Sequence, residues 1–334
     1  MKKIINLKIV LTLITISLFL TFGLSASAID QNLVMGSSVE GTWAFRVATG
    51  MARLIDRQAE GINLSVQPGW TTTAGIYAYD RNEVQITYTN VGALVDAWNN
   101  RGIFKDGPVS YKPYQGIWFM SSAHTLAVEK DNEDINSWSD IAGKGVFPCA
   151  AGTGSYTLAQ DIFGRLGLWT GGENEADIKQ VGYPEVADAF RQGVIDATLI
   201  YIMSGETLPS GYADLESRMD IKIINPSEEE KLIISEMPGY VPGYMIDPKK
   251  VFRGDVGVDE IWGIALLFGW HFGPAEDTET VYKITKTWYE NADELLAIDA
   301  GFLEFKNNGF GLNASVYNAY PDIPVHPGVA KYLK

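Results

Sequence analysis

Short apolar runs alternate with amphipathic segments along most of the chain. Residues 33–36 form an apolar run typical of a buried strand, and apolar side chains then recur from Ala44 to Ile55 at the spacing of one helix face. The same order of strand and helix recurs with strands at 62–66 and 84–87. Three consecutive units of this kind predict an α/β fold.

A second series of such units follows a loop-rich passage at 108–113, which we interpret as a crossover. Its strands are predicted at 116–120, 125–128, 146–150 and 197–201. The stretch 238–244, rich in Tyr, Pro and Gly, fits a return connection better than a helix, and the apolar run 261–270 then rejoins the first sheet. A chain of 334 residues is long enough for two lobes. The predicted division is 29–113 with 238–334 in lobe 1, and 114–237 in lobe 2.

The first thirty residues have a different pattern. Three Lys within the first eight residues precede an apolar run at 9–24, and small residues follow at 26–28. This pattern predicts a signal peptide over 1–28, cleaved after Ala28, and a periplasmic mature protein. An uncleaved anchor is the alternative, because the run approaches the length that spans a bilayer. Cleavage would change the net charge from −15 to −18, since this segment holds three Lys and no acidic residue.

Composition excludes several classes of function. With 46% hydrophobic and 20% charged residues the chain is globular, and its net negative charge argues against nucleic acid as a partner. The single cysteine, Cys149, excludes an internal disulfide and is predicted to be a small buried residue. The three histidines, His124, His271 and His326, lack the spacing of zinc ligands, so no metal or other cofactor is expected.

Four loops of small residues follow predicted strands, at 36–43, 70–74, 88–90 and 152–156. In open α/β sheets ligands bind at the carboxyl ends of strands, where backbone N–H groups and helix N-termini can reach them. The side chains of these loops are hydroxyls, an amide and aromatic rings, which suit a small carboxylate or another polar anion. The alternative is that each loop merely caps the helix after it, which is the commoner use of Ser and Thr there.

Two other interpretations of the Gly-rich loop at 152–155 fit less well. It lacks the last Gly of a dinucleotide fingerprint and the Lys of a phosphate-binding loop. Ser155 lacks the second Gly of a nucleophile elbow. A secreted α/β enzyme using Ser155 or Asp196 stays open as an alternative, but the sequence shows no convincing base beside either residue.

Several motifs resemble the TAXI family of solute-binding proteins, the extracytoplasmic receptors of one class of tripartite ATP-independent periplasmic (TRAP) transporters. They are SWSDIAGKGV at 137–146, GTGS at 152–155 and IPVHPGVAKY at 323–332, and they occur in the family's order. The resemblance implies a two-lobed periplasmic-binding-protein fold with two crossover segments and an interlobe cleft. It also implies a receptor, not an enzyme, that closes on a small carboxylate or amino acid and delivers it to a TRAP-type permease.

Family members are associated with glutamate, glutamine and 2-oxoglutarate, and we expect a monomer. A sensory receptor of the same fold is a further alternative. The resemblance does not decide whether Arg46 or His124 reaches the cleft. The ligand-binding residues that it implies are Ser37, Ser38, Thr42, Trp43, Thr72, Thr73, Tyr88, Thr89 and Asn90 in lobe 1, and Thr153, Gly154, Ser155, Tyr156, Tyr201 and Ser204 in lobe 2.

Overall fold

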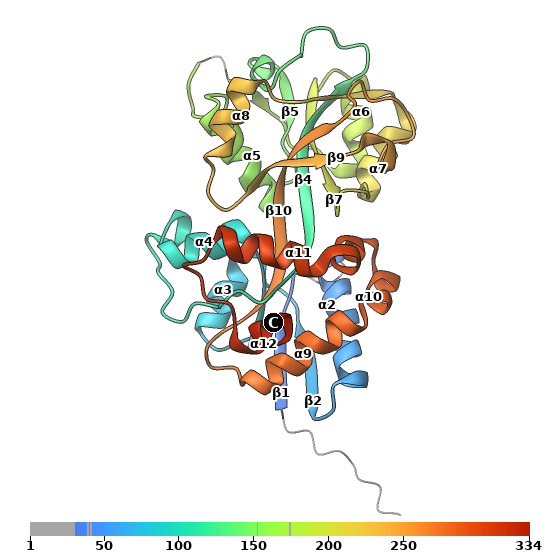
Figure 1. Cartoon of the computed structure of the whole chain (residues 1–334). Helices are drawn as coiled ribbons and strands as arrows, with labels where there is room; N and C mark the ends of the chain where they lie inside the picture. The colour runs from blue at the N-terminus through green and yellow to red at the C-terminus, as the bar shows by residue number, and fades with distance from the viewer. Residues whose placement is uncertain (1–30, 39, 41, 152, 174) are drawn as a thin grey trace, which may run out of the picture.

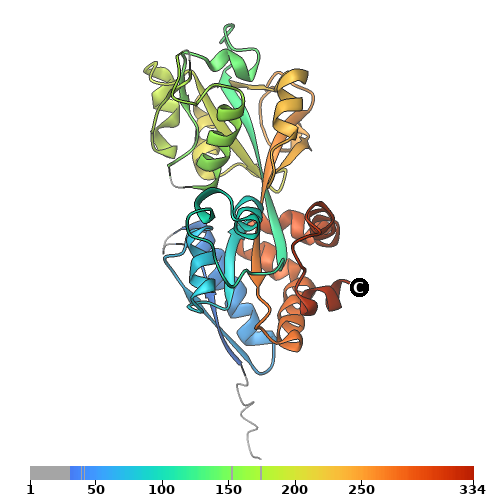
Figure 2. The ribbon, with the colours of Figure 1, turned by 90° about the vertical axis from the view of Figure 1, so that its left-hand side faces the viewer.

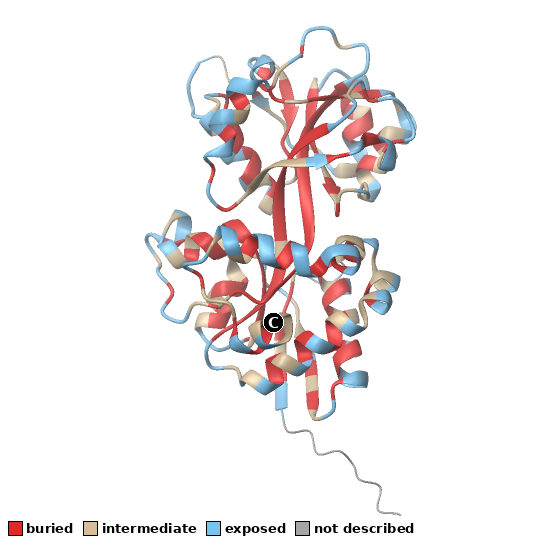
Figure 3. Cartoon of the chain, viewed as in Figure 1, coloured by how far each residue is buried: buried red, intermediate tan, exposed pale blue. Residues whose placement is uncertain are grey.

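Two long strands, β4 (Ile117–Glu129) and β10 (Ile261–Phe272), run side by side through both lobes of the protein (Figure 1). The computed structural model describes residues 31–38, 40, 42–151, 153–173 and 175–334, so the predicted signal peptide lies outside the described residues. The two strands pair antiparallel, from Ile264 opposite His124 to Trp270 opposite Ile117. Almost every residue of both is buried (Figure 3), as expected for strands covered on both faces.

The lower lobe in Figure 1 contains the first three strands, the helices that follow them and the C-terminal helices. Its sheet has the order β2-β1-β3-β10-β4, in which β1 (Gln31–Gly36) is parallel to β2 (Ile62–Gln67) and to β3 (Ile86–Asn90). Its helices are α2 (Trp43–Gln58), α3 (Ala74–Asp80), α4 (Val91–Asn99), α9 (Thr278–Glu290), α10 (Ala292–Ile298), α11 (Leu303–Ala319) and α12 (Pro327–Leu333), with short turns η1 (Gly102–Phe104) and η5 (Ala300–Phe302). The three strand-and-helix units predicted at the start of the chain are confirmed.

The upper lobe contains the elements that lie between β4 and β10 in the chain. Its strands extend the shared pair in the order β4-β7-β5-β6, while β8 pairs with β4 and β9 with β10. These strands are β5 (Gly145–Phe147), β6 (Asp177–Ile178), β7 (Ala197–Met203), β8 (Ile221–Ile224) and β9 (Val241–Ile246). Its helices are α5 (Gly154–Arg165), α6 (Val186–Arg191), α7 (Ser210–Arg218) and α8 (Glu228–Ser235), with short turns η2 (Trp138–Ile141), η3 (Tyr183–Glu185) and η4 (Pro248–Lys250).

The chain crosses between the lobes within β4 and within β10, as Figure 2 also shows. The predicted two-lobed α/β fold with two crossover segments is therefore confirmed. The division after residues 113 and 237 stays a prediction; β9, which follows the second of these positions, pairs with Ile261–Ala265 of β10. The two strands predicted at 116–120 and 125–128 are one strand, since the polar residues between them continue the pairing with β10 and β7.

Cys149 is a buried residue of the upper lobe, as predicted. Its thiol donates to the carbonyl oxygen of Leu199 at 3.1 Å, and burial raises the pKa of Cys149 to about 12. At neutral pH the thiol is therefore protonated and unreactive, which fits a packing role.

Candidate functional site

The floor of the cleft between the lobes is the place where β4 and β10 cross. Successive residues of a strand face opposite sides, so Met120 and Ser122 of β4 line the cleft while Ser121 faces the other way. Phe268 of β10 lies beside them on the same floor. The polar pair Ser121-Ser122 thus interrupts an apolar strand where the two lobes meet.

A cavity of about 630 Å³ opens above this floor, which is within the range of pockets that hold small molecules. Both lobes and the shared strands contribute to its wall. The lining residues are Trp43, Arg46, Tyr88, Asp299 and Ala300 from the lower lobe, Met120, Ser122 and Phe268 from the crossing strands, and Ser155, Tyr201, Met203, Thr207, Leu208, Pro209 and Ser210 from the upper lobe. We call it the large cavity.

Polar groups in the large cavity are available to a ligand. The hydroxyls of Tyr88 and Ser122 make no hydrogen bond with the residues that the structure describes, although both residues are buried. The nearby Tyr201 hydroxyl comes from the opposite lobe, and burial raises the pKa of Tyr201 to about 12. These phenols therefore stay neutral and can donate or accept hydrogen bonds.

His124 determines the direction in which the Ser155 hydroxyl donates its hydrogen bond. The Nδ1 atom of His124 lies 3.3 Å from the carbonyl oxygen of Ile264, which can only accept, so Nδ1 carries the proton. Nε2 then accepts a hydrogen bond from the Ser155 hydroxyl at 2.8 Å. The Ser155 oxygen is left as an acceptor toward the large cavity. Burial lowers the pKa of His124 to about 4, so this arrangement persists at neutral pH.

One ion pair lies at the edge of the large cavity. Arg46, on the first turn of α2, donates from Nη2 to Oδ2 of Asp299 at 2.6 Å. The other oxygen of Asp299 accepts from the backbone N–H of Gly301 at 2.8 Å, which holds the carboxylate in place. The Arg46 side chain is 60% exposed, so it can turn toward a ligand. The sequence left the position of Arg46 open, and the structure places it at the cavity.

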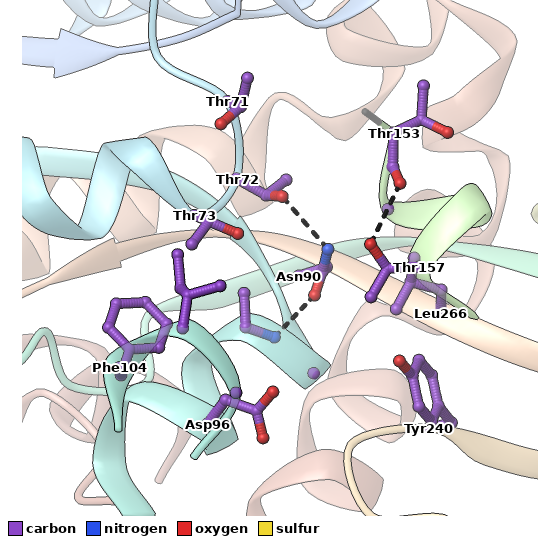
Figure 4. A pocket seen from close by; sticks show the side chains of 15 residues that line it. Thr71, Thr72, Thr73, Asn90, Asp96, Phe104, Thr153, Thr157, Tyr240 and Leu266 are labelled. Atoms are coloured by element: carbon purple, nitrogen blue, oxygen red, sulfur yellow. Dashed lines mark hydrogen bonds between the residues drawn. The ribbon is translucent and has the colours of Figure 1, made fainter. Parts of the chain in front are cut away.

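A second, smaller cavity of about 180 Å³ lies beside the first (Figure 4). Several of its polar groups are already engaged: Asn90 accepts from the N–H of Ala93 at 2.8 Å and donates to Thr72 at 3.3 Å. Thr153 caps α5 by accepting from the N–H of Tyr156 at 3.2 Å. Most of these residues therefore have the capping role that was the alternative for the loops.

Asn90 of the lower lobe and Gly154 of the upper lobe lie close together in the wall of the small cavity. A Cβ atom on Gly154 would lie only 2.8 Å from the side-chain nitrogen of Asn90. Leu266 and Phe268, two residues apart on β10, line the small and the large cavity respectively. A glycine at 154 is thus what allows α5 to begin against the lower lobe.

The structure brings together only part of the ligand-binding set that the sequence predicted. Trp43, Tyr88, Ser155 and Tyr201 line the large cavity, and Thr72, Thr73, Asn90, Thr153 and Gly154 line the small one. The others line neither of these cavities: Ser37, Ser38, Thr42, Thr89, Tyr156 and Ser204.

Most residues of this last group have other contacts. Thr42 accepts from the N–H of Phe45 as the N-cap of α2, and Thr89 donates to the carbonyl of Thr72. The ring of Tyr156 packs edge-on against Trp169. The hydroxyl of Ser204 donates to the carbonyl of Gly301 at 2.7 Å, which ties the end of β7 to the lower lobe. Ser37 is fully buried, and its hydroxyl has no partner among the described residues.

The sequence did not predict that the crossing strands and residues 207–210, after β7, line the large cavity. Met120, Ser122 and Phe268 were not predicted, and neither were 207–210. The signal for Ser122 was present, since a Ser-Ser pair within a long buried strand is out of place unless it has a polar neighbour or faces a cavity. The expected lack of a base near Ser155 was wrong, because β4 carries His124 to its side. Asp196 instead accepts from the backbone N–H of Gly145.

The described part of the chain lacks two further kinds of feature. Its His, Cys, Asp and Glu residues form no group of three or more that could hold a metal ion. Within the same residues no helix combines the length and apolarity needed to span a membrane.

Fold and site together define a two-lobed α/β protein of the periplasmic-binding-protein type, with a ligand-sized cavity between lobes joined by two strands. The chain belongs to the NMT1-like family, whose model matches residues 35–334. No curated protein matches it.

The chain is distantly similar to the following three solved structures. MatC from Rhodopseudomonas palustris with bound malate has a TM-score of 0.49 and 9% identity, covering 90% of this chain and 97% of that one. A putative L-cystine ABC transporter from Listeria monocytogenes has a TM-score of 0.44 and 15% identity, covering 82% and 96%. The aliphatic sulphonate binding protein SsuA from Escherichia coli has a TM-score of 0.42 and 12% identity, covering 91% and 82%.

Proposed function

We propose that this protein is a periplasmic receptor that binds a small solute in the large cavity and closes its two lobes around it. The observation that carries the proposal is the composition of that cavity's wall. The hydroxyls of Tyr88 and Ser122, which have no partner among the described residues, lie in a wall to which both lobes add aromatic rings above a floor of two strands. A solute that contacts both lobes at once stabilises a more closed arrangement, because it gains contacts there that the open arrangement lacks.

The contacts that the large cavity offers can supply the free energy of micromolar binding. Micromolar binding needs about 8 kcal/mol, and hydrogen bonds to a charged group contribute about 1.5–3 kcal/mol each. A few such contacts therefore reach the required free energy, and five residues of the wall can make them: Arg46, Tyr88, Ser122, Ser155 and Tyr201. The aromatic rings around them add apolar burial. The finer proposal, supported by the TAXI-like motifs, is that the closed form delivers a small carboxylate or amino acid to a TRAP-type permease.

The test is a thermal-shift screen of purified mature protein against small carboxylates and amino acids, followed by calorimetry and small-angle scattering. A receptor is stabilised by its solute, becomes more compact and returns the solute unchanged. If no solute in a broad metabolite screen raises the melting temperature, or if the compound that does so is consumed, the receptor function is wrong.

His124 and Ser155 favour a second candidate function, a serine hydrolase. The hydroxyl and the imidazole are at hydrogen-bond distance, Ser155 lines the cavity, and it sits in the first turn of α5, where backbone N–H groups could face an oxyanion. A catalytic triad also needs a carboxylate that orients the histidine, and this third residue is missing from the described part of the chain. The partner of His124 Nδ1 is the backbone carbonyl of Ile264, and no carboxylate there hydrogen-bonds with His124. Burial also opposes the imidazolium that the reaction needs.

A fluorophosphonate probe distinguishes the two candidates. A hydrolase becomes covalently labelled at Ser155, and Ser155→Ala abolishes both the label and the cleavage of a p-nitrophenyl ester. A receptor is not labelled above the level of Ser155→Ala.

A further inference from the structure

Charge in the wall of the large cavity is balanced within the protein. Among the described residues that line it, Arg46 and Asp299 are the only charged ones, and they pair with each other at 2.6 Å. One carboxylate can join this pair, because the guanidinium has five N–H donors and Asp299 accepts from Nη2 alone. A second carboxylate would be buried with no cation beside it, which is costly.

Aromatic and other apolar groups dominate the rest of the wall. Tyr88 stacks on Phe268, with ring centroids 5.7 Å apart and planes at 11°, so their edges form a flat surface. Trp43 and Tyr201 add rings from the two lobes, and the remaining apolar lining residues are Met120, Met203, Leu208, Pro209 and Ala300. Flat rings and thioethers of this kind pack well against a flat apolar solute.

The volume of the large cavity also suits a flat apolar solute. A cavity of about 150 Å³ is enough to hold benzene. The large cavity, at about 630 Å³, therefore has room for a substituted ring. The small cavity, at about 180 Å³ and with its amide and threonine groups already engaged, does not offer comparable surface.

Ser155 adds a requirement at the other end of the solute. Its proton is directed at His124, so its oxygen can only accept from a bound molecule. A ring substituent with an O–H or N–H bond meets this requirement.

We propose, on the basis of the receptor function above, that the solute is an aromatic monocarboxylate carrying a hydrogen-bond donor. Its carboxylate binds Arg46, and its ring lies against Trp43, Tyr88 and Phe268. Dicarboxylates such as 2-oxoglutarate and glutamate, which the TAXI resemblance implies, are poor fits because the described part of the wall offers no second cation for them.

The experiment is calorimetry of the mature protein with two sets of probes. The first set is benzoate, 4-hydroxybenzoate and 3-phenylpropionate, with benzamide as the uncharged control, and the second is glutarate, 2-oxoglutarate and glutamate. We expect 4-hydroxybenzoate to bind at least tenfold more tightly than any member of the second set and than benzamide.

Substitutions test whether Arg46 is the residue that binds the carboxylate of the solute. Arg46→Gln should weaken 4-hydroxybenzoate binding at least tenfold, whereas Arg53→Gln should change it less than twofold. Arg53→Gln is the matched control because it removes the same charge from the same helix. Arg53 itself does not line the large cavity. Ser155→Ala should reduce the preference for 4-hydroxybenzoate over benzoate.

Each other outcome overturns the proposal. Tighter binding of any member of the second set excludes the aromatic class but leaves the receptor function intact. Failure of all six acids at millimolar concentration also excludes the class, and the broader metabolite screen then decides the receptor function separately. Equal losses in Arg46→Gln and Arg53→Gln would show that the cavity pair is not the anion contact.

Discussion

A hydrogen-bonded cluster behind the crossing strands holds the lobes in the observed arrangement. Glu304, on the first turn of α11, accepts from Tyr244 of β9 at 2.9 Å and from the N–H and hydroxyl of Ser121 at 3.1 and 2.5 Å. Helix α11 lies across the strands at the junction of the lobes (Figure 1). Because Ser121 faces away from the cleft, closing the cleft should pull Tyr244 of the upper lobe away from Glu304 of the lower lobe.

We predict that Tyr244→Phe shifts the unliganded protein toward the closed arrangement. The substitution removes the hydrogen bond from Tyr244 to the Glu304 carboxylate together with the 3.0 Å contact between the Tyr244 and Ser121 hydroxyls, and it leaves the two hydrogen bonds from Ser121 to Glu304 in place. The lower end of the range for such bonds, about 1.5 kcal/mol, applies because the contact is only partly buried, and it corresponds to roughly a tenfold change in the ratio of closed to open molecules. Solute affinity should rise by about the same factor, provided that the closed share remains small.

Single-molecule energy transfer between dyes on the two lobes measures this ratio. Cysteines introduced at the exposed positions Gln58 and Glu133 can be labelled selectively, since Cys149 is the only native cysteine and is buried. The matched control is Tyr79→Phe, which removes a hydrogen bond to Glu276 within the lower lobe and should leave the ratio unchanged. An unchanged ratio in Tyr244→Phe, or an equal shift in the control, would refute the reasoning.

Three further predictions follow from contacts described above. Ser155→Ala should weaken solute binding at least tenfold in calorimetry without unfolding the protein, whereas Thr153→Ala should mainly cost about 1 kcal/mol of stability by removing a helix cap; unchanged affinity would remove Ser155 from the site. Burial lowers the pKa of His124 to about 4 and of His271 to about 3 from 6.5, so their neutral forms stabilise the fold above pH 6.5 and this stability is lost as the pH falls toward 4. Thermal unfolding of His124→Asn should accordingly depend less on pH over that interval than the native protein does. Cys149 should react with iodoacetamide only at the rate of unfolding, and rapid labelling of the native protein would contradict its buried position.

Much of the fold was predictable because its hydrophobic patterning is local. The strand-and-helix units and the two crossovers follow from apolar runs and loop composition. The length of β4 was not predictable in the same way, since its central residues are polar and look like a break between two strands. They are buried because partners distant in sequence satisfy them: Glu304 for Ser121, and Ser155 for His124.

The candidate site was predictable only in part because helix caps and ligand contacts use the same residue types. Asn90 and Thr153 were predicted as ligand contacts, and both have their side chains engaged as caps. Tyr88 and Trp43 come from the same kind of loop but reach the large cavity. Which side of a loop a side chain faces depends on the packing of the whole lobe, and this information is absent from the local sequence.

The position of β10 between β3 and β4 also constrains how the molecule is made. The lower lobe begins at the N-terminus, yet β3 meets β4 only through a strand that is synthesised after residue 260. During synthesis, the N-terminal third of the chain therefore has no complete sheet to join. Folding of that lobe must wait for the last third of the polypeptide, so the molecule becomes native late and in both halves nearly together.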